Sequence, residues 1–468
     1  MIDFALLAQV LFWLTLVGIF LASGQASLFH PLTVYLAFHG LVFVLRPILV
    51  NGFGFDTNWN YMVFKPTAGH FVETLAVSSV ALLSFFVACL AAGWTRVSFA
   101  GPAPRLTALE QRALIATILL LLPVAAYSIY STRNGIAGER VNGIYIMTGS
   151  TGYLNEAQHF VMPLLCAMLV LTRFHWANLF PVLLYISYRV WFGWSRWTIL
   201  LFLLMVVLTY CWYSRKKWLP WWSVAIAVPA LILFNVLGHN RDFLKQILVG
   251  QQVQVVQEDP GMTPEEKIKA QIDTQDYANF DYLSYIVSIV PDRTGRYTYG
   301  LQYLQLFTEP IPRLLWKGKP IGAPVRTIDI NAYGNFTGLT VSLCGDAWMS
   351  GGWAGLVIML SLVGIVLGRL HRWFWRHADR NLGALGYIIT LAMVPQWYRD
   401  GGISIAKFLL FTLLPILVWK GMKWILDQRL VPAYSVWLPP NTRVRFVPAA
   451  PAKPDGQAAS DSTGWRPA

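Results

Sequence analysis

The chain has 468 residues, of which 56% are hydrophobic and 13% are charged, and its net charge is +13. A soluble globular protein carries about a quarter charged residues, so this composition excludes an ordinary soluble protein. Runs of about 20 apolar residues recur and predict membrane spans, and in such a protein an excess of positive charge indicates basic cytoplasmic loops rather than nucleic-acid binding.

Hydropathy predicts about eleven transmembrane helices. They are expected near residues 3–22, 29–50, 70–93, 112–131, 156–172, 178–193, 196–213, 218–238, 353–370, 383–398 and 403–427. The first run lacks the basic start of a cleavable signal peptide, so we expect it to remain as a span. The predicted fold class is an all-α polytopic integral membrane protein with one large, partly helical external loop.

Four loop regions are rich in Lys and Arg and determine the predicted orientation. They hold Arg96, Arg105 and Arg112, the sequence RKKW at 215–218, the run at 369–380, and the region of Lys420, Lys423 and Arg429. Cytoplasmic loops carry this excess, and with about eleven spans all four regions fall on one side. The N-terminus is then expected outside and the C-terminus inside.

The spans divide the chain into four predicted parts. Residues 1–238 form an N-terminal transmembrane bundle, 239–352 a large external loop, and 353–430 the C-terminal transmembrane helices. Residues 431–468 are polar and rich in Pro, Ala and Gly, a composition that cannot bury a core. We therefore expect a disordered cytoplasmic tail there.

The external loop is too long for a plain connection and is expected to be functional. A helix is predicted from Thr263, which forms a capping box with Glu266, to Pro291, which ends it. A second short helix is expected over YTYGLQYLQLF at 297–307. The tyrosines crowded here have an apolar face and a polar tip, which suits sugar rings, although packing is the alternative explanation.

After these helices comes TEPIPRLLWKGKPIGAPVR, residues 308–326, which we call the cationic strap. Its prolines hold the backbone extended and so present cations from a stiff chain. The alternative is that Arg313 pairs with Glu309 or docks on lipid headgroups, and that Lys317 and Lys319 contact lipid headgroups. A strap on the outer side is unexpected under the rule that places basic loops inside.

The loop ends in small residues and glycines around Asp346, in NAYGNFTGLTVSLCGDAWMSGGWAG. A carboxylate where the chain re-enters the membrane is costly unless it is paired or takes part in function. Asp346 is therefore a candidate base, and a capping role for a re-entrant helix is the alternative.

These residues resemble the bacterial oligosaccharide repeat-unit polymerases, the Wzy-type polymerases of O-antigen and exopolysaccharide. The resemblance lies in Pro-Arg-x-x-Trp-x-x-Lys-Pro, Pro312 to Pro320, and in the small-residue segment with Asp346 before a glycine-rich re-entry. GWSRWTIL at 193–200 is similar to the Arg-bearing segment of that family. One departure is that no outer Arg is followed by Gly at the spacing of the RX10G pattern of some members.

The resemblance implies a metal-independent glycosyltransferase without cofactors, in the bacterial inner membrane. It would join oligosaccharide repeat units carried on undecaprenyl pyrophosphate at the periplasmic face. The implied partners are that lipid-linked oligosaccharide, the membrane, a chain-length regulator and a flippase. The sequence itself shows no Asp-x-Asp motif, no CxxC pair and no His/Cys cluster at metal-ligand spacing.

Such a reaction needs cations for pyrophosphate and a base for the acceptor hydroxyl. The candidate catalytic residues are Asp346 and Arg313, with His239 and Asp400 as alternates to Asp346. The candidate substrate-binding residues are Lys317, Lys319, Arg326, Arg293, Arg296, Arg241, Arg196, Tyr299 and Trp316. Arg196 and Arg189 have the alternative of reaching out to the membrane surface.

Three other functions remain open at this level. An O-antigen ligase would share the cationic loop, and a transferase using polyprenyl-monophosphate sugars would use Asp56. A lipid-linked oligosaccharide transporter or flippase is disfavoured because such proteins show internal repeats and midplane charges. The polar residues expected inside the second span are His30, His39 and Arg46, and they are candidates for a buried polar cluster.

Overall fold

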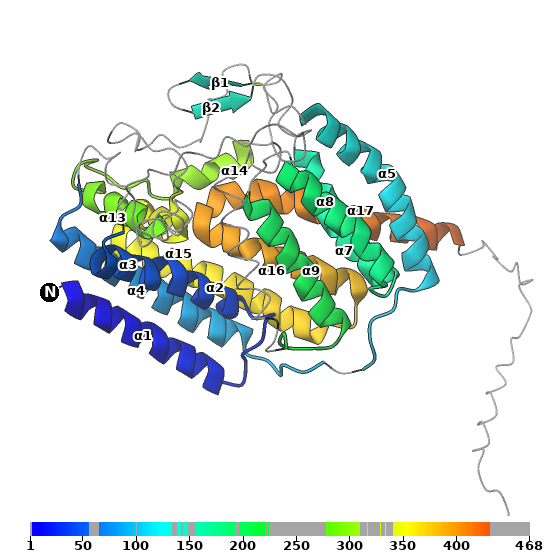
Figure 1. The fold of residues 1–468 in the computed structure, drawn as a ribbon, viewed down its shortest axis with the longest axis horizontal. Coiled ribbons are helices and arrows are strands. Elements are labelled where there is room, and N and C mark those ends of the chain that lie inside the picture. The colour runs from blue at the N-terminus through cyan, green and yellow to red at the C-terminus, as the bar shows by residue number, and fades with distance from the viewer. Residues whose placement is uncertain are drawn as a thin grey trace, which may run out of the picture.

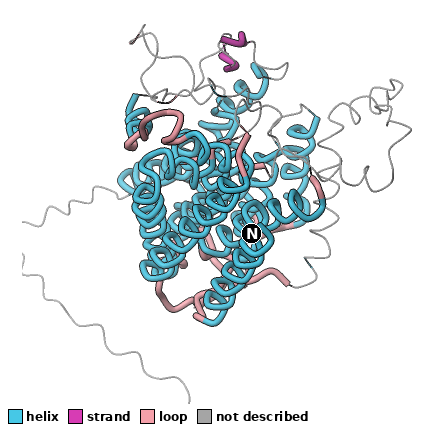
Figure 2. The backbone as a smooth tube through the Cα atoms, turned by 90° about the vertical axis from the view of Figure 1, so that its left-hand side faces the viewer, coloured by secondary structure: helices cyan, strands magenta, loops and turns pink. Residues whose placement is uncertain are grey.

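The structure is a computed structural model that describes residues 2–55, 65–99, 101–132, 138–141, 144–147, 156–191, 196–220, 223, 278–308, 316, 328, 333 and 340–430. Helices packed side by side make up the bundle in Figure 1. The two described strands form a small antiparallel hairpin, β1 (Gly138–Val141) with β2 (Ile144–Met147), at the periphery of the bundle in Figures 1 and 2. The expected helical architecture is confirmed.

The described helices follow the order of the predicted spans. They are α1 (Ile2–Ala22), α2 (Pro31–His39), the π-helix η1 (Gly40–Leu45), α3 (Arg46–Phe53), α4 (Ala68–Gly93), α5 (Ala108–Thr132), η3 (Ala157–Phe160), α7 (Val161–Leu171), η4 (Trp176–Asn178), α8 (Leu179–Trp191), α9 (Arg196–Tyr213), α13 (Asn279–Ile289), η6 (Leu301–Leu304), α14 (Gln305–Thr308), α15 (Ser342–Arg376), α16 (Asn381–Asp400) and α17 (Gly402–Leu430).

In the described part of the chain, six helices are long and apolar enough to cross a membrane. They are Ile2–Ala22, Pro31–Phe53, Ala68–Gly93, Ala108–Ser131, Ser342–Arg376 and Phe408–Gln428. Every predicted span except 218–238 overlaps a described helix, and most of 218–238 lies outside the described residues. A multi-pass membrane protein is therefore supported, while the count of about eleven spans stays a prediction.

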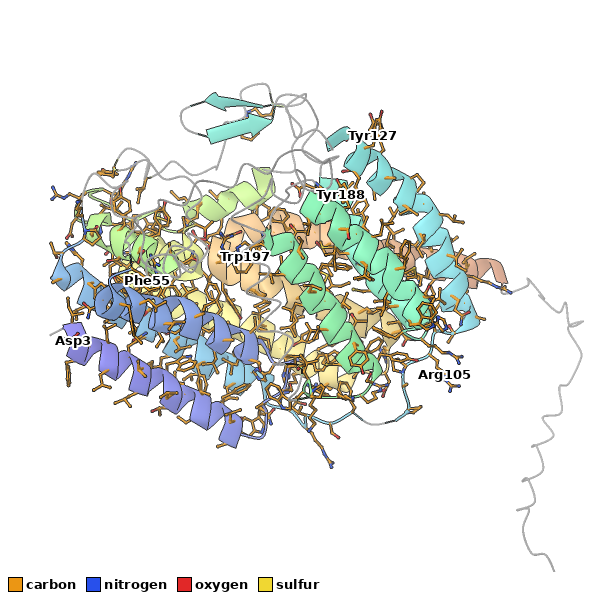
Figure 3. All side chains as sticks on the ribbon, in the orientation of Figure 1. Asp3, Phe55, Arg105, Tyr127, Tyr188 and Trp197 are labelled. Carbon is orange, nitrogen blue, oxygen red and sulfur yellow. The ribbon has the colours of Figure 1, made fainter. Side chains whose placement is uncertain are left out.

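Loops from distant parts of the sequence meet at one end of the bundle, which we call the basic end. There the Arg215 guanidinium donates to the Pro102 carbonyl at 3.0 Å and pairs with Asp379 at 2.8 Å. The Asn381 amide donates to the Arg105 carbonyl at 3.0 Å. Arg105 and Asp3 lie at opposite ends of the molecule in Figure 3. Three of the basic regions thus share one end of the bundle.

Glu110 connects the fourth basic region to the same end. Its carboxylate accepts from Lys423 Nζ at 2.8 Å, from Asn381 Nδ2 at 2.9 Å, and from the Thr107 backbone N–H at 3.0 Å. Trp419 Nε1 donates to the Glu110 carbonyl at 2.9 Å. Because the buried acid has both an opposite charge and neutral donors, this contact joins α5, α16 and α17 without an unpaired charge.

The helices α4 and α15 pack closely against each other. A Cβ built on Gly368 would lie 2.6 Å from the Cys89 carbonyl oxygen, and one built on Gly364 would lie 2.9 Å from that of Phe85. Gly93 approaches Gly368 from the α4 side. Glycines four residues apart let two backbones approach closely, which is how membrane helices gain packing contacts.

The helix α15 is interrupted at Gly351 and Gly352. Gly352 has φ 56° and ψ −134°, a backbone conformation that favours glycine, and a Cβ there would also lie 2.8 Å from the Tyr297 hydroxyl. The break separates a short helix, residues 342–350, from the long apolar part that follows. The predicted span at 353–370 begins after the break, and the chain is already helical from Ser342.

The helix α13 is buried along its whole length and packs against α4, α15 and the η1–α3 segment. It ends before Pro291, as expected from the sequence, while the predicted start at Thr263 lies outside the described residues. Trp348 of the short helix donates to the Val290 carbonyl at 2.8 Å. Two parts of the predicted external loop, α13 and 342–350, thus pack inside the bundle at the end opposite the basic end.

Candidate active site

Asp346 lies on the short helix 342–350 and is only 6% exposed. Its Oδ2 accepts from the Tyr303 hydroxyl at 2.9 Å and from the Gly402 backbone N–H at 2.8 Å. Gly402 is the first residue of α17, so the carboxylate caps that helix and meets its positive end. A side chain at Gly401 would collide with the same oxygen, at 2.9 Å. Two distant segments therefore hold this one acid.

Tyr303 and Gln302 bring η6 onto the same short helix. Gln302 Nε2 donates to Ser350 Oγ at 2.6 Å, and the Tyr303 ring would contact any side chain at Gly402. Burial raises the pKa of the Tyr303 phenol, and the neighbouring Asp346 carboxylate raises that pKa further. The phenol therefore stays protonated in neutral solution and donates to Asp346.

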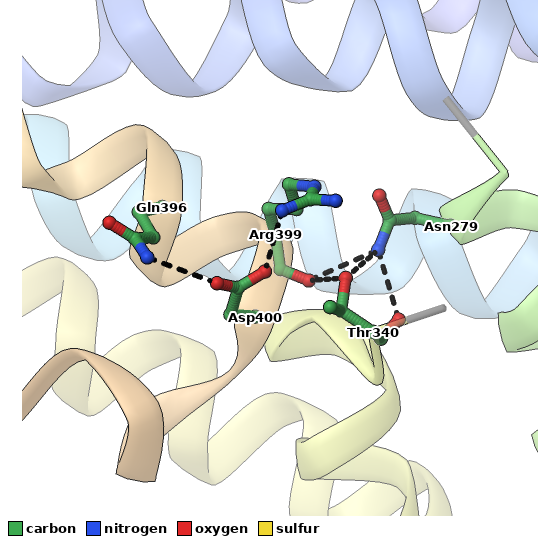
Figure 4. A network of polar contacts seen from close by, with 5 residues as sticks. All are labelled: Asn279, Thr340, Gln396, Arg399 and Asp400. Carbon is green, nitrogen blue, oxygen red and sulfur yellow. Dashed lines mark hydrogen bonds and ion pairs between the residues drawn. The ribbon is translucent and has the colours of Figure 1, made fainter. Parts of the chain in front are cut away.

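A second acid, Asp400, is the last residue of α16 and lies two residues before Gly402 in the sequence (Figure 4). Its Oδ1 accepts from the Arg399 guanidinium at 3.3 Å and its Oδ2 from Gln396 Nε2 at 3.2 Å. The Arg399 carbonyl accepts from Asn279 Nδ2 at 3.0 Å and from Thr340 Oγ1 at 2.9 Å. Asp346 thus contacts Gly402, two residues after Asp400, so the two acids that the sequence proposed as alternatives for one role belong to segments that meet.

The start of α9 meets the same group. The Arg399 guanidinium carbon lies 4.6 Å from the centroid of the Trp197 ring, a cation–π contact. Arg196, the predicted substrate-binding residue, is the neighbour of Trp197 and begins α9, and its side chain lies outside the described residues. The backbone of Arg196 is therefore adjacent to the Asp400 group.

Arg189 is buried rather than directed to the membrane surface, with 2% exposure. Its guanidinium donates to Gln158 Oε1 at 2.6 Å. His159 follows Gln158 in η3. Its Nε2 atom lies 3.4 Å from the Glu156 carboxylate, and its ring packs against the Phe408 ring of α17. The alternative in which Arg189 reaches out to the membrane surface does not fit this burial, because Gln158 provides a buried polar partner.

Arg293, Arg296 and Tyr299 lie on the loop between α13 and η6 and are exposed, Tyr299 to 72%. The loop is fixed to the short helix because the Met349 carbonyl accepts from both the backbone N–H of Thr298, at 2.8 Å, and its hydroxyl, at 3.1 Å. Three predicted substrate-binding residues are therefore carried on a loop that is anchored three residues after Asp346.

The cationic strap lies almost wholly outside the described residues. Trp316 is described and is 37% exposed. The other predicted residues that fall outside the described ranges are Arg313, Lys317, Lys319, Arg326, Arg241, His239 and Asp56. Their placement relative to Asp346 stays a prediction.

Asp281 was not among the candidate residues, although it forms a fully buried ion pair. Arg46 NH2 lies 2.8 Å from Asp281 Oδ2, and each side chain is 1% exposed. His30, His39 and Arg46, the candidates for a buried polar cluster, are all buried, and the two histidines have other polar neighbours. The His30 ring lies 4.2 Å from the His371 ring, and His39 Nε2 lies 3.4 Å from Gln9 Nε2. The signal for Asp281 was a carboxylate inside the otherwise apolar and aromatic run FDYLSYIVSI.

The chemistry available to the group is acid–base and electrostatic. It offers two carboxylates, a protonated phenol, a helix N-terminus and nearby guanidinium groups. No cluster of three or more His, Cys, Asp or Glu side chains that could hold a metal ion occurs within the described ranges. Such a group can orient a hydroxyl and stabilise a developing negative charge.

Comparison of the chain with protein-family models, with curated proteins and with solved structures finds no match.

Proposed function

We propose that the protein is a metal-independent glycosyltransferase that joins oligosaccharide repeat units carried on undecaprenyl pyrophosphate. The observation that carries the proposal is the buried group in which Asp346 accepts from Tyr303 and Gly402 beside the Arg399–Asp400 pair. A buried acid with organised donors, at the end of a membrane bundle, is costly and is therefore expected to serve a function. The resemblance to repeat-unit polymerases, which covers roughly residues 280–370, supplies the substrate class.

The proposed topology follows from the two ends. If the basic end faces the cytoplasm, the Asp346 group faces the other side, which in the bacterial inner membrane is the periplasm. With about eleven spans the N-terminus is then periplasmic and the C-terminus cytoplasmic. A chain-length regulator and a flippase would act with the protein at that face.

In the proposed reaction, a hydroxyl of the acceptor repeat unit attacks the anomeric carbon of the donor. A new carbon–oxygen bond forms, the bond from that carbon to the pyrophosphate oxygen breaks, and undecaprenyl pyrophosphate leaves. The hydroxyl proton passes to Asp346, or to its neighbour Asp400, and then to water. Because Asp346 already accepts two hydrogen bonds through Oδ2, the proposal requires its other oxygen to receive the hydroxyl.

The leaving pyrophosphate requires cations. We assign this role to Arg313 of the strap, supported by Arg293 and Arg296 of the anchored loop, since guanidinium groups bind phosphate oxygens bidentately. Tyr299 and Trp316 are exposed, as a sugar-binding surface requires. Lys317, Lys319, Arg326, Arg241 and Arg196 complete the proposed binding set.

The test is complementation of a strain deleted for the gene, with membrane levels of the protein measured in parallel. Wild type should restore long glycan chains, whereas Arg313→Ala should leave single repeat units attached to the acceptor at a normal protein level. Normal chain lengths in Arg313→Ala would remove the strap from the mechanism. Accumulation of finished but unattached lipid-linked polymer in the deleted strain would establish a ligase and overturn the polymerase.

Transport of the lipid-linked unit is a second candidate, and two observations favour it. The second span contains the π-helix η1, and α15 is interrupted by two glycines. The buried ion pair of Arg46 with Asp281 joins the second span to α13. Interrupted helices and buried charges are features of transporters. Movement of a labelled lipid-linked oligosaccharide across vesicles containing the purified protein, without chain growth, would favour this function.

A further inference from the structure

The first turn of α13 carries two polar side chains that contact different parts of the bundle. Asn279 and Asp281 are buried, and they lie two residues apart on a helix that is itself enclosed by α4, α15 and the η1–α3 segment. A buried polar group is stable only when its hydrogen bonds are satisfied, so each contact fixes the geometry of its partner.

Asn279 connects the two chain segments that carry the acids of the candidate site. Its Nδ2 donates to the Thr340 carbonyl at 3.0 Å, to Thr340 Oγ1 at 2.9 Å and to the Arg399 carbonyl at 3.0 Å (Figure 4). Thr340 lies two residues before the start of the short helix with Asp346, and Arg399 directly precedes Asp400. One amide therefore sets the separation between the two acid-bearing segments.

Asp281 fixes α13 from the other side. The ion pair with Arg46 joins it to α3, directly after the π-helix η1. Local π-helical turns occur frequently at functional sites, because the extra residue re-aims the side chains that follow. Here the residue that follows η1 is Arg46 itself.

We propose that Asn279 and Asp281, with Arg46 as the partner of Asp281, are positioning residues for the reaction at Asp346 and Asp400. This inference rests on the proposed function. The Arg46–Asp281 ion pair holds α13 against the second span, and Asn279 transmits that position to Thr340 and the Arg399 carbonyl. A shift of α13 then changes the distance between Asp346 and the segment at 399–402, with no loss of a group that touches substrate.

The test uses the purified full-length protein in lipid nanodiscs with an undecaprenyl-pyrophosphate-linked repeat unit as substrate. Asp281→Asn keeps the size of the side chain and removes its charge, whereas Arg46→Lys keeps the charge and removes the planar guanidinium. Asn279→Asp replaces the donor with an acceptor that faces carbonyl oxygens. Glu110→Gln is the matched control, because Glu110 is also a buried acid paired with a cation, at the basic end.

Misplacing reacting groups by about 1 Å costs on the order of 100-fold in rate. We therefore expect kcat per folded molecule to fall between about tenfold and 100-fold in Asp281→Asn and Asn279→Asp, while KM for the donor changes by less than about threefold. Glu110→Gln should retain the wild-type kcat. Unchanged kcat in the α13 variants, or a loss explained wholly by less folded protein, would overturn the inference.

Hydrogen exchange gives a readout that does not depend on the reaction. Amides of residues 342–350 and 401–402 should exchange faster in Asp281→Asn than in wild type and stay unchanged in Glu110→Gln. If wild type makes no polymer, the proposed function fails, and faster exchange still supports the positioning role. If exchange at both segments is unchanged in Asp281→Asn and in Arg46→Lys, the positioning role itself is wrong.

Discussion

The two ends of the bundle use charged residues in opposite ways. At the basic end the cations Arg105, Lys216 and Arg376 are exposed, and the buried acid Glu110 is neutralised by Lys423 and joins loops. At the other end Arg46, Asp281 and Asp346 are buried on interrupted or enclosed helices. The first arrangement suffices for orientation and stability, while the second is costly to bury and indicates a function.

The largest expected effect is at the Arg46–Asp281 ion pair. Asp281→Ala leaves the Arg46 charge buried without its carboxylate, which costs about 3–5 kcal/mol. We expect a large fall in thermal stability, measured by fluorescence-detected size-exclusion chromatography after heating. A double replacement, Arg46→Met with Asp281→Leu, should recover most of that stability, and an unchanged stability of Asp281→Ala would contradict the burial of the pair.

A substitution at the contact between α4 and α15 should lower the stability of the whole bundle. Gly368→Leu forces a side chain into the Cys89 carbonyl and the α4 backbone. Overpacking of this kind costs about 1–3 kcal/mol. Membrane levels should fall, and Gly421→Leu is the control, since nothing lies within 4 Å of a Cβ there. Equal levels for the two variants would disprove the close contact of α4 with α15.

Two tyrosines offer a matched comparison of the ends. Tyr303→Phe removes a donor to Asp346, and Tyr387→Phe removes a donor to the Phe29 carbonyl at 2.6 Å, at the basic end. Each should cost about 1 kcal/mol. Only Tyr303→Phe should lower polymer formation per folded molecule, by about tenfold. Equal activity of both variants would remove Tyr303 from the site.

The smallest effect is expected at the Arg215–Asp379 pair. Asp379 is 72% exposed, so water and salt screen the interaction. Asp379→Ala should change the free energy of unfolding by less than about 0.5 kcal/mol and leave polymer formation unchanged. A loss larger than that of Glu110→Gln would show that exposed pairs at the basic end matter more than the buried one.

The features that the sequence predicted are those carried by local patterns. Apolar runs located the helices, Pro291 located the end of α13, and the Lys and Arg clusters located a shared end. Asp346 and Asp400 stood out as carboxylates at membrane edges. Their relation could not be predicted, because Asp346 meets Gly402 across 56 residues of sequence.

The missed residues depend on such long-range contacts. Asn279 and Arg399 are 120 residues apart, and Arg46 and Asp281 are 235 apart. No periodicity or spacing connects them. Tyr303 is one of several tyrosines in this region of the sequence, and only its hydrogen bond to Asp346 in the structure distinguishes it from the others.

The most direct test of the central claim compares one acid from each end in the same complementation assay. Asp346→Asn and Glu110→Gln each replace a buried carboxylate with its amide, and the glycan ladder is measured per unit of folded protein. We predict that Asp346→Asn is present in the membrane but makes no long chains, whereas Glu110→Gln makes a wild-type ladder. A wild-type ladder from Asp346→Asn at a normal level would contradict the account.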